Sequence, residues 1–302
     1  MVIWGSVGFL IGIILGSFTK VLADRSLIGK YFKGRSYCLF CKTELRWYDL
    51  FPIFSYILLA GKCRYCKKKI GMEYLLVEVA VGLLVGFLFF QSFQGLSPLQ
   101  FQISNFKFQI KVIEVLLNIF FIAVLTALFL TDLKKMFIPD RVILPAIVVG
   151  AVSLFLFTIY KIGYLYFYLS QTPVGRYLLP PHSDYFQRHA LITAQPFLLS
   201  ILMGLAIGGF FLSLIIITRG KGMGGGDVKL GAFIGLMLGF PNALVALILS
   251  FLTGAVFSVG LILLGKKHFG QTIPFGPFLV LGSLIMLYWG SQIIDWYLHL
   301  GQ

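Results

Sequence analysis

Long apolar stretches separated by short polar segments dominate the hydrophobic pattern of the chain. A helix that crosses a bilayer needs about 20 consecutive, mainly apolar residues. Stretches of roughly that length occur at 2–24, 74–91, 112–131, 142–160, 197–217, 243–264 and 275–297, and a shorter one covers 228–240. We therefore predict an all-α integral membrane protein, a polytopic helical bundle of about eight transmembrane helices, with one small soluble module.

The polar segments between these stretches suggest three parts. Residues 1–24 lack the basic start and the small-residue cleavage site of a secretory signal peptide, so we expect a retained first transmembrane helix. Residues 25–72 form the polar module, and residues 73–302 form a transmembrane domain. We expect this domain to carry two external loops, at about 92–111 and 161–196.

Composition and charge agree with a membrane protein. The chain is 59% hydrophobic and only 12% charged, with a mean hydropathy of +0.93, which is outside the usual balance of soluble domains. Of its 25 Lys and Arg residues, twelve lie between Lys20 and Lys69. Because cytoplasmic segments of membrane proteins are enriched in basic residues, we expect residues 25–72 to face the cytosol and both chain ends to lie outside.

The net charge of +14 could also suggest nucleic acid as a partner. No base-stacking or recognition motif accompanies the basic residues, so we expect no nucleic-acid binding. We interpret the charge as orientation in the membrane and contact with an anionic lipid bilayer.

All four cysteines lie in the polar module. They form two CxxC pairs, Cys38 with Cys41 and Cys63 with Cys66, with 21 residues between the pairs. This spacing is typical of a closed four-thiolate zinc site, and a reducing cytosol disfavours disulfides. The sequence therefore predicts a structural zinc ion, with disulfides or free thiols as the alternatives.

Two of the eleven acidic residues lie at the same predicted depth. Asp132 closes the third apolar stretch, and Asp227 precedes the short stretch at 228–240. Acids at membrane depth are costly and usually face the interior of the helical bundle. A purely structural interpretation is available for both, because Asp227 stands at a possible helix N-cap and Asp132 can pair with Lys134 or Lys135.

A run of glycines precedes Asp227. It formally contains G-x-G-x-x-G, but it follows an apolar span rather than a strand and no Walker lysine comes after it, so we reject a nucleotide site. Glycines permit close backbone approach, which would leave room for an extended peptide beside the acid; the three involved are Gly224, Gly225 and Gly226. Two carboxylates can divide general acid and general base work on a water molecule, as in aspartic proteases.

These motifs resemble those of the type IV prepilin peptidase family. The run from Gly224 to Asp227 fits the GxGD motif of intramembrane-type aspartyl proteases, and Asp132 followed by IPD at 138–140 is similar to the first catalytic-acid motif of that family. The amino-terminal half is also similar to the cytosolic domain of bifunctional members, in GSF at 16–18, both CxxC pairs, RWYDLFPIFSYILLAGKCRYC at 46–66 and LVE at 76–78. The resemblance covers most of the chain outside the two external loops.

The resemblance implies a membrane-embedded aspartic endopeptidase that cleaves the basic leader peptide of type IV prepilins or pseudopilins. It would act at the cytosolic face of the bacterial cytoplasmic membrane, with Asp132 and Asp227 as the catalytic pair and Asp140 in support. Bifunctional members then methylate the new amino terminus with S-adenosylmethionine. For that second reaction the candidate acids are Glu73 and Glu78.

The sequence departs from the family pattern at four positions, all in the region associated with methylation. Lys20, two residues after GSF, stands where members commonly carry Asn. Leu39, directly after the first cysteine, stands where members usually carry Pro. Glu73 and Leu75 stand where members favour Arg and Pro. None of these departures touches the predicted protease acids.

The main alternative is a non-enzymatic membrane scaffold or transporter with a zinc docking module. A transport path needs polar groups near mid-membrane, and the predicted spans contain almost none besides Glu114 and Asn118. This alternative also leaves the glycine run and the paired acids without a role. A zinc protease is disfavoured because no H-E-x-x-H motif occurs, and a serine protease because no histidine is suitably placed.

Overall fold

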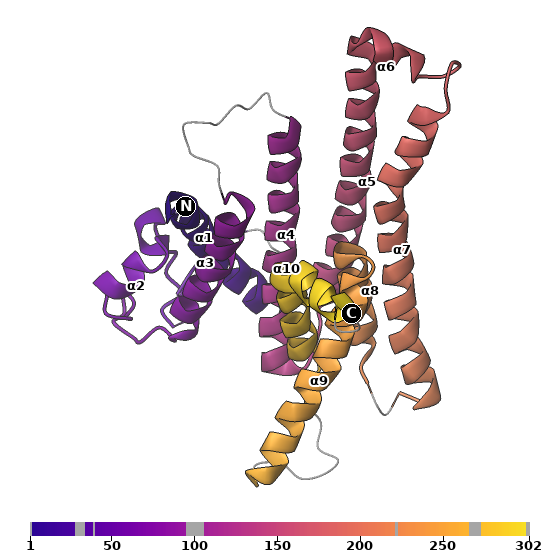
Figure 1. Ribbon diagram of the computed structural model, residues 1–302. Helices are drawn as coiled ribbons and strands as arrows, with labels where there is room; N and C mark the ends of the chain where they lie inside the picture. Colours follow the sequence, from indigo (N-terminus) through magenta and orange to yellow (C-terminus); the bar gives the residue numbers. More distant parts are fainter. Residues whose placement is uncertain are drawn as a thin grey trace. The chain divides into compact units, whose positions relative to one another are not determined.

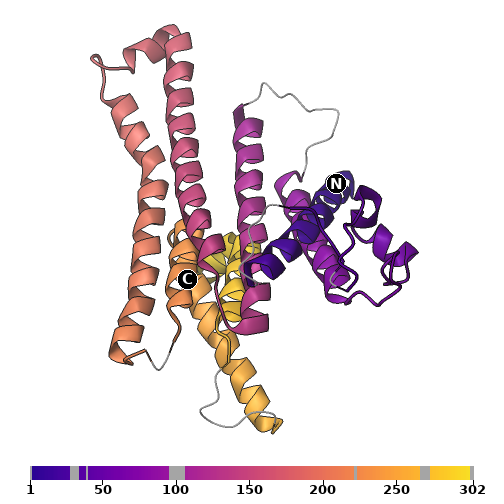
Figure 2. The same ribbon diagram turned by 180° about the vertical axis from the view of Figure 1, so that it is seen from behind.

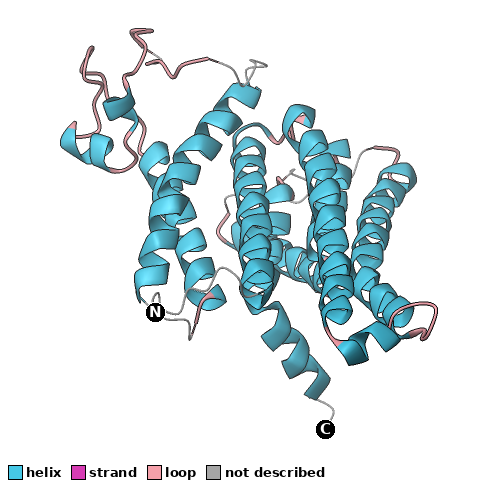
Figure 3. Ribbon diagram, turned by 90° about the horizontal axis from the view of Figure 1, so that it is seen from above, coloured by secondary structure: helices cyan, strands magenta, loops and turns pink. Residues whose placement is uncertain are grey.

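The computed structural model describes residues 2–27, 34–38, 40–94, 106–220, 223–265 and 273–299. Within these ranges the chain is mostly helical and no β-strand occurs (Figure 3). Seven of the described helices are long and apolar enough to cross a membrane. The predicted class is therefore confirmed, and the protein is a multi-pass membrane protein.

The amino-terminal unit spans Met1–Pro139 and the carboxyl-terminal unit spans Asp140–Gln302. The described residues of the first unit form three long helices and two short ones: α1 (Val2–Leu27), η1 (Trp47–Leu50), α2 (Phe54–Leu58), α3 (Glu73–Ser92) and α4 (Phe106–Lys135). The long helices α1, α3 and α4 pack on one another. The polar segment between α1 and α3 contains η1 and α2 and both CxxC pairs.

Glycines bring α1 and α3 into close contact, as the neighbouring ribbons in Figure 1 show. Gly8, Gly12 and Gly16 recur at every fourth position of α1, so they share one face of the helix. At Gly12 an added methyl group would lie 2.7 Å from both the Cα of Gly82 and the carbonyl oxygen of Val81. Small residues at such positions let membrane helices approach closely and gain van der Waals contact.

In the carboxyl-terminal unit the part of the chain that the structure describes forms four long helices and two shorter ones: α5 (Asp140–Gln171), α6 (Pro173–Tyr177), α7 (Tyr185–Ile217), α8 (Gly225–Leu238), α9 (Asn242–Leu263) and α10 (Gly276–His299). Helices α5 and α7 pack together, and the view from behind shows α6 at the turn between them (Figure 2). Thr172 caps α6 by accepting a hydrogen bond from the Gly175 amide at 3.1 Å, and Pro173 occupies the first turn, where its missing N–H costs nothing.

Helix α8 has 14 residues, too few to cross a bilayer at 1.5 Å per residue. It corresponds to the short stretch at 228–240, and it packs closely against α7. A methyl group at Gly235 would lie 2.5 Å from the carbonyl oxygen of Met203, and one at Gly231 would lie 2.6 Å from the Phe211 ring. Both positions therefore require glycine for this packing.

The helices extend further than the apolar stretches. Helix α5 continues to Gln171 and α7 begins at Tyr185, so much of the segment 161–196 is helical, with a break around Pro180 and Pro181. In the other predicted loop, α4 already begins at Phe106, while residues 95–105 lie outside the described residues. The three-part division by function, at residues 24 and 72, stays a prediction.

Replacing Gly12 by Ala should destabilise the contact between α1 and α3, because the methyl group overlaps backbone atoms that cannot move away. We expect a loss of about 1–3 kcal/mol, typical of overpacking, visible as a lower thermal unfolding midpoint in detergent. Gly5→Ala is the matched control, because its methyl group would meet its nearest neighbours at 3.8 Å. Equal midpoints for the two variants would contradict this packing.

Candidate functional site

The two CxxC pairs fold into turns with the same backbone pattern. The amide of Lys42 donates to the carbonyl of Cys38, and the amide of Lys67 donates to that of Cys63, both at 3.0 Å. Lys42 and Lys67 both have positive φ, 59° and 58°. The CxxC spacing identifies the cysteines but not these two lysines. The sequence feature that they share is their position, four residues after the first cysteine of each pair.

The two turns bring all four cysteines together as free thiols. Their sulfur atoms lie within 4.8 Å of one another, and the sulfurs of Cys38 and Cys66 are 3.8 Å apart. Tetrahedral coordination with metal–sulfur bonds of about 2.3 Å places sulfurs about 3.8 Å apart. Cys38 and Cys63 are buried. The four cysteines can therefore hold a metal ion, and none of the four forms a disulfide.

The pKa values of three of the thiols are shifted by neighbouring groups. Hydrogen bonds from Thr43 lower the pKa of Cys41 to about 6, and the backbone amide of Cys66 lowers the pKa of Cys63. The amide of Lys68 also favours a thiolate at Cys66, but burial and the neighbouring sulfurs outweigh it and raise that pKa to about 11. Without a cation the cluster resists full deprotonation, so a bound metal ion would supply the charge that four thiolates need.

Asp49, which sequence reasoning did not single out, ties the second turn to η1. Its side chain is 2% exposed. It accepts hydrogen bonds from Nε of Arg64 at 2.7 Å, from the hydroxyl of Tyr65 at 3.0 Å and from the amide of Arg46 at 3.2 Å. Burial alone would raise the pKa of Asp49, but these three donors lower it. A sequence feature that could have drawn attention to Asp49 is the small number of acidic residues in the chain, eleven in total.

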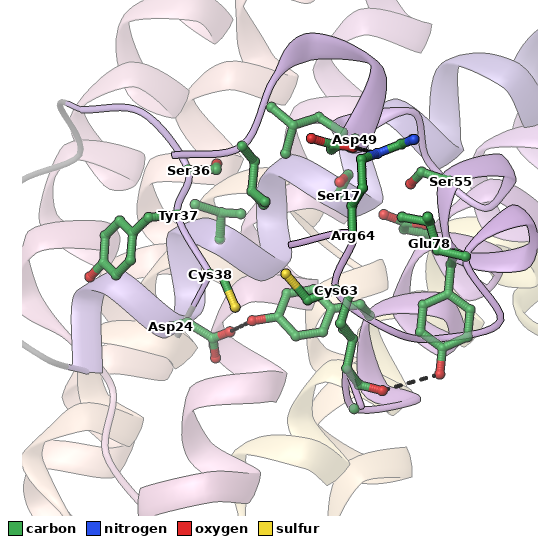
Figure 4. Close-up of a pocket in the computed structure, with 18 of the residues that line it drawn as sticks. Ser17, Asp24, Ser36, Tyr37, Cys38, Asp49, Ser55, Cys63, Arg64 and Glu78 are labelled. Atoms are coloured by element: carbon green, nitrogen blue, oxygen red, sulfur yellow. Dashed lines mark hydrogen bonds and ion pairs between the residues drawn. The ribbon is translucent and has the colours of Figure 1, made fainter. Parts of the chain in front are cut away.

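A cavity of about 230 Å³ lies between this polar segment and helices α1 and α3. Three acids line it, Asp24 from α1, Asp49 from η1 and Glu78 from α3, and Figure 4 shows them with Cys38 and Cys63 around the same space. Tyrosines complete much of the wall: Tyr37, Tyr56 and Tyr74. Arg25 and Arg64 also line it, and Asp24 and Asp49 form ion pairs with basic side chains. Glu78 and the tyrosine rings are therefore the groups of the wall that suit a cationic group.

Glu78 connects α3 to the polar segment. It is buried and accepts a hydrogen bond from the amide of Ile53 at 2.7 Å. Ile53 has φ 62° and ψ −55°, a strained conformation for a β-branched residue, so the carboxylate helps to hold it. Among the described residues no Lys or Arg forms an ion pair with Glu78.

Glu73 has a different environment from Glu78. Its carboxylate lies 3.1 Å from Nζ of Lys20 and 2.7 Å from Nζ of Lys134, and it is more than half exposed. The structure thus separates the two acids that sequence reasoning grouped together. Glu73 is neutralised by two lysines, whereas Glu78 lines the cavity.

Asp132 lies in the last turn of α4 and is 6% exposed. Its carbonyl accepts the amide of Met136 at 2.8 Å, and Met136 ends the helix with φ 48°. Lys134, suggested above as a partner of Asp132, instead pairs with Asp24 and Glu73.

Asp227 is the third residue of α8, while Gly224 occupies the N-cap. The structural interpretation of Asp227 as an N-cap is therefore wrong, although a carboxylate in the first turn still suits the helix dipole. A methyl group at Gly224 or Gly225 would meet no described atom within 4 Å. Gly226 lies in α8 beside Asp227.

Asp140 begins α5 and forms an ion pair at 2.5 Å with Lys229 of α8. This pair connects the first turn of α5 to the first turns of α8, and the supporting role of Asp140 stays a prediction. Asp140 and Asp227 belong to the carboxyl-terminal unit and Asp132 to the other unit.

Comparisons with known proteins agree with both halves of this description. The bacterial peptidase A24 N-terminal domain matches residues 10–92, and the type IV leader peptidase family matches residues 185–259. A relative from Aeromonas salmonicida, named prepilin leader peptidase/N-methyltransferase, is 30% identical over 87% of this chain and 74% of its own. The chain belongs to the type IV leader peptidase family.

Two further relatives extend the similarity of this family member over nearly the whole chain. Proteins of the same name from Bacillus subtilis and Pseudomonas aeruginosa are 28% and 27% identical. They cover 98% and 96% of this chain and 98% and 92% of their own lengths. No solved structure matches the chain.

Replacing Cys63 by Ser should abolish metal binding, because the hydroxyl is a poor substitute for one of four thiolates around a single ion. The measurement is the metal content of the purified protein by inductively coupled plasma mass spectrometry, beside wild type. Arg35→Gln, which removes only an exposed ion pair with Glu44, is the control. Undiminished metal in the Cys63 variant would contradict a four-cysteine site.

Proposed function

We propose that this family member is a membrane-embedded aspartic endopeptidase that removes the basic leader peptide of type IV prepilins or pseudopilins. The observation that carries the proposal is Asp227 in the first turn of α8, within the region that matches the leader peptidase family. Asp132, buried in the last turn of α4, supplies the second carboxylate. The basic segment Lys20 to Lys69 supports a cytosolic active-site face in a bacterial cytoplasmic membrane.

In this proposal the two acids act as a pair on one water molecule. The ionised carboxylate accepts a proton from the water, whose oxygen attacks the scissile carbonyl, and the protonated carboxyl donates to the leaving amine. Their two apparent pKa values belong to the pair. No described atom lies within 4 Å of a methyl group at Gly224 or Gly225, which supports room for an extended peptide beside Asp227. The pair of Asp140 with Lys229 would steady the start of α8.

The metal ion that the cysteines bind would be zinc. Four thiolates in tetrahedral arrangement are typical of structural zinc sites, and the sulfur spacing fits zinc–sulfur bonds. With four protein ligands the ion has no open position, so its role is to hold the two turns of the polar segment together. Hydrolysis would thus depend on the carboxylates and not on the metal.

The protein would also methylate the amino terminus that cleavage exposes, using S-adenosylmethionine. The cavity beside Glu78 supports this second activity, because Glu78 and the tyrosine rings of its wall can attract the α-ammonium group and the sulfonium of the methyl donor, which are both cationic. Glu78 is the better candidate of the two acids, since it lines the cavity and has no described cationic partner. It would accept the proton that the amine loses when the methyl group is transferred.

A non-enzymatic scaffold or transporter receives no support. The two matching families and the three relatives named above all carry peptidase names. The packing of the described helices also leaves few polar side chains in the buried core of either unit.

Asp132→Asn and Asp227→Asn should each reduce leader cleavage by about a hundredfold or more, because the isosteric amide can neither accept nor donate the proton. The assay is cleavage of a purified prepilin in lipid vesicles, with mass spectrometry of the new amino terminus. Asp295→Asn is the matched control, an exposed acid of α10 that should cleave like wild type. Retained cleavage in either of the first two variants refutes the catalytic pair.

Glu78→Gln should lose methylation while leader cleavage continues, because the amide cannot accept the proton from the amine. The same mass spectra report this, since the methylated product is heavier by one CH₂. Glu44→Gln, an exposed acid of the same polar segment, should still methylate. Methylation by the Glu78 variant at the wild-type rate would remove this residue from the reaction.

A further inference from the structure

Four charged side chains form a closed ring where α1, α3 and α4 meet. Nζ of Lys20 lies 2.8 Å from Asp24 and 3.1 Å from Glu73, and Nζ of Lys134 lies 3.1 Å from Asp24 and 2.7 Å from Glu73. Each cation thus contacts both acids, and the charges cancel. We call these four residues the charge ring.

The charge ring is anchored from inside the helix bundle. The side chain of Lys20 is 1% exposed, and its ammonium group lies 4.6 Å from the centre of the Tyr74 ring. Tyr74 also donates a hydrogen bond to Asp24 at 3.1 Å. A buried ammonium group needs its partners, so Lys20 holds both acids in place for Lys134, which is 35% exposed.

Through Lys134, the charge ring also restrains the end of α4 that carries Asp132. The two residues are two positions apart, which is about 200° around an α-helix, so their side chains leave the helix in nearly opposite directions. The helix ends one residue after Lys134, and terminal turns fray unless they are tied down. The ring therefore fixes the rotation of the last turn from the side opposite Asp132.

A second contact also joins the last turn of α4 to α1. Nζ of Lys135 lies 3.5 Å from the carbonyl oxygen of Leu27, the last residue of α1. Both lysines of the last turn of α4 thus reach the end of α1. Lys111 instead pairs with Glu114 of its own helix at 4.0 Å.

We propose that the charge ring is a positioning device for leader cleavage, in which Lys134 is a positioning residue that sets the direction of Asp132. The inference rests on the proposed function of Asp132. Lys20 and Glu73 depart from the family pattern, and in this proposal both contribute to the protease reaction because they hold Lys134 in place. None of the four ring residues needs to touch the substrate.

The test compares Lys134→Met, Lys134→Arg and Lys111→Met in purified full-length protein. For each variant kcat and KM for prepilin cleavage are measured in vesicles, together with the thermal unfolding midpoint. Lys134→Met should lower kcat about tenfold to a hundredfold with KM within about twofold of wild type, because a small misplacement of a catalytic group costs this much. Lys134→Arg should recover most of kcat, and Lys111→Met should match wild type in all three quantities.

Two results would overturn the positioning role. Wild-type kcat in Lys134→Met shows that the ring does not affect Asp132. A loss of activity that follows the unfolding midpoint, and disappears at an assay temperature well below it, shows a role in stability alone. The proposed function fails in a different way, since in that case Asp132→Asn itself would still cleave the prepilin.

Discussion

A charged side chain in a membrane-spanning helix is stable only with a partner of opposite charge or in a polar site, and this constraint orders the amino-terminal unit. Lys20 is almost completely buried in α1, yet it is accommodated because Asp24 and Glu73 neutralise it. The same two acids hold Lys134 of α4. One buried lysine thereby connects three helices at a single level, a connection that apolar packing would not by itself place there.

The polar segment is held by two different forces. The four cysteine sulfurs lie within 4.8 Å of one another, and a metal ion bound by them would hold the two CxxC turns together. Asp49 attaches the second turn to η1, and Glu78 attaches the segment to α3 through the Ile53 amide. The cavity between them is therefore bounded by groups with fixed positions, which is the requirement for a selective binding site.

The sequence predicted much of this structure because hydrophobic length and cysteine spacing are local signals. The seven long helices among the described residues all fall on predicted apolar stretches, and the CxxC spacing indicated the cysteine cluster. The charge ring could not be predicted, because Asp24, Glu73 and Lys134 are distant in sequence and only helix packing joins them. The place of Asp227 within α8 was also missed, since Gly224 caps that helix in extended conformation and the glycine run hid its start.

Asp132 and Asp227 are proposed to work on one peptide bond, which requires their side chains to meet in the active protein. The direct measurement is disulfide cross-linking of a chain carrying Asp132→Cys and Asp227→Cys, with metal bound to the four native cysteines, in membranes under mild oxidation. Mass spectrometry of the digested protein should find a linked peptide that joins positions 132 and 227. If a small maleimide labels both introduced thiols but no link between them forms, the two acids do not share a site and the account is wrong.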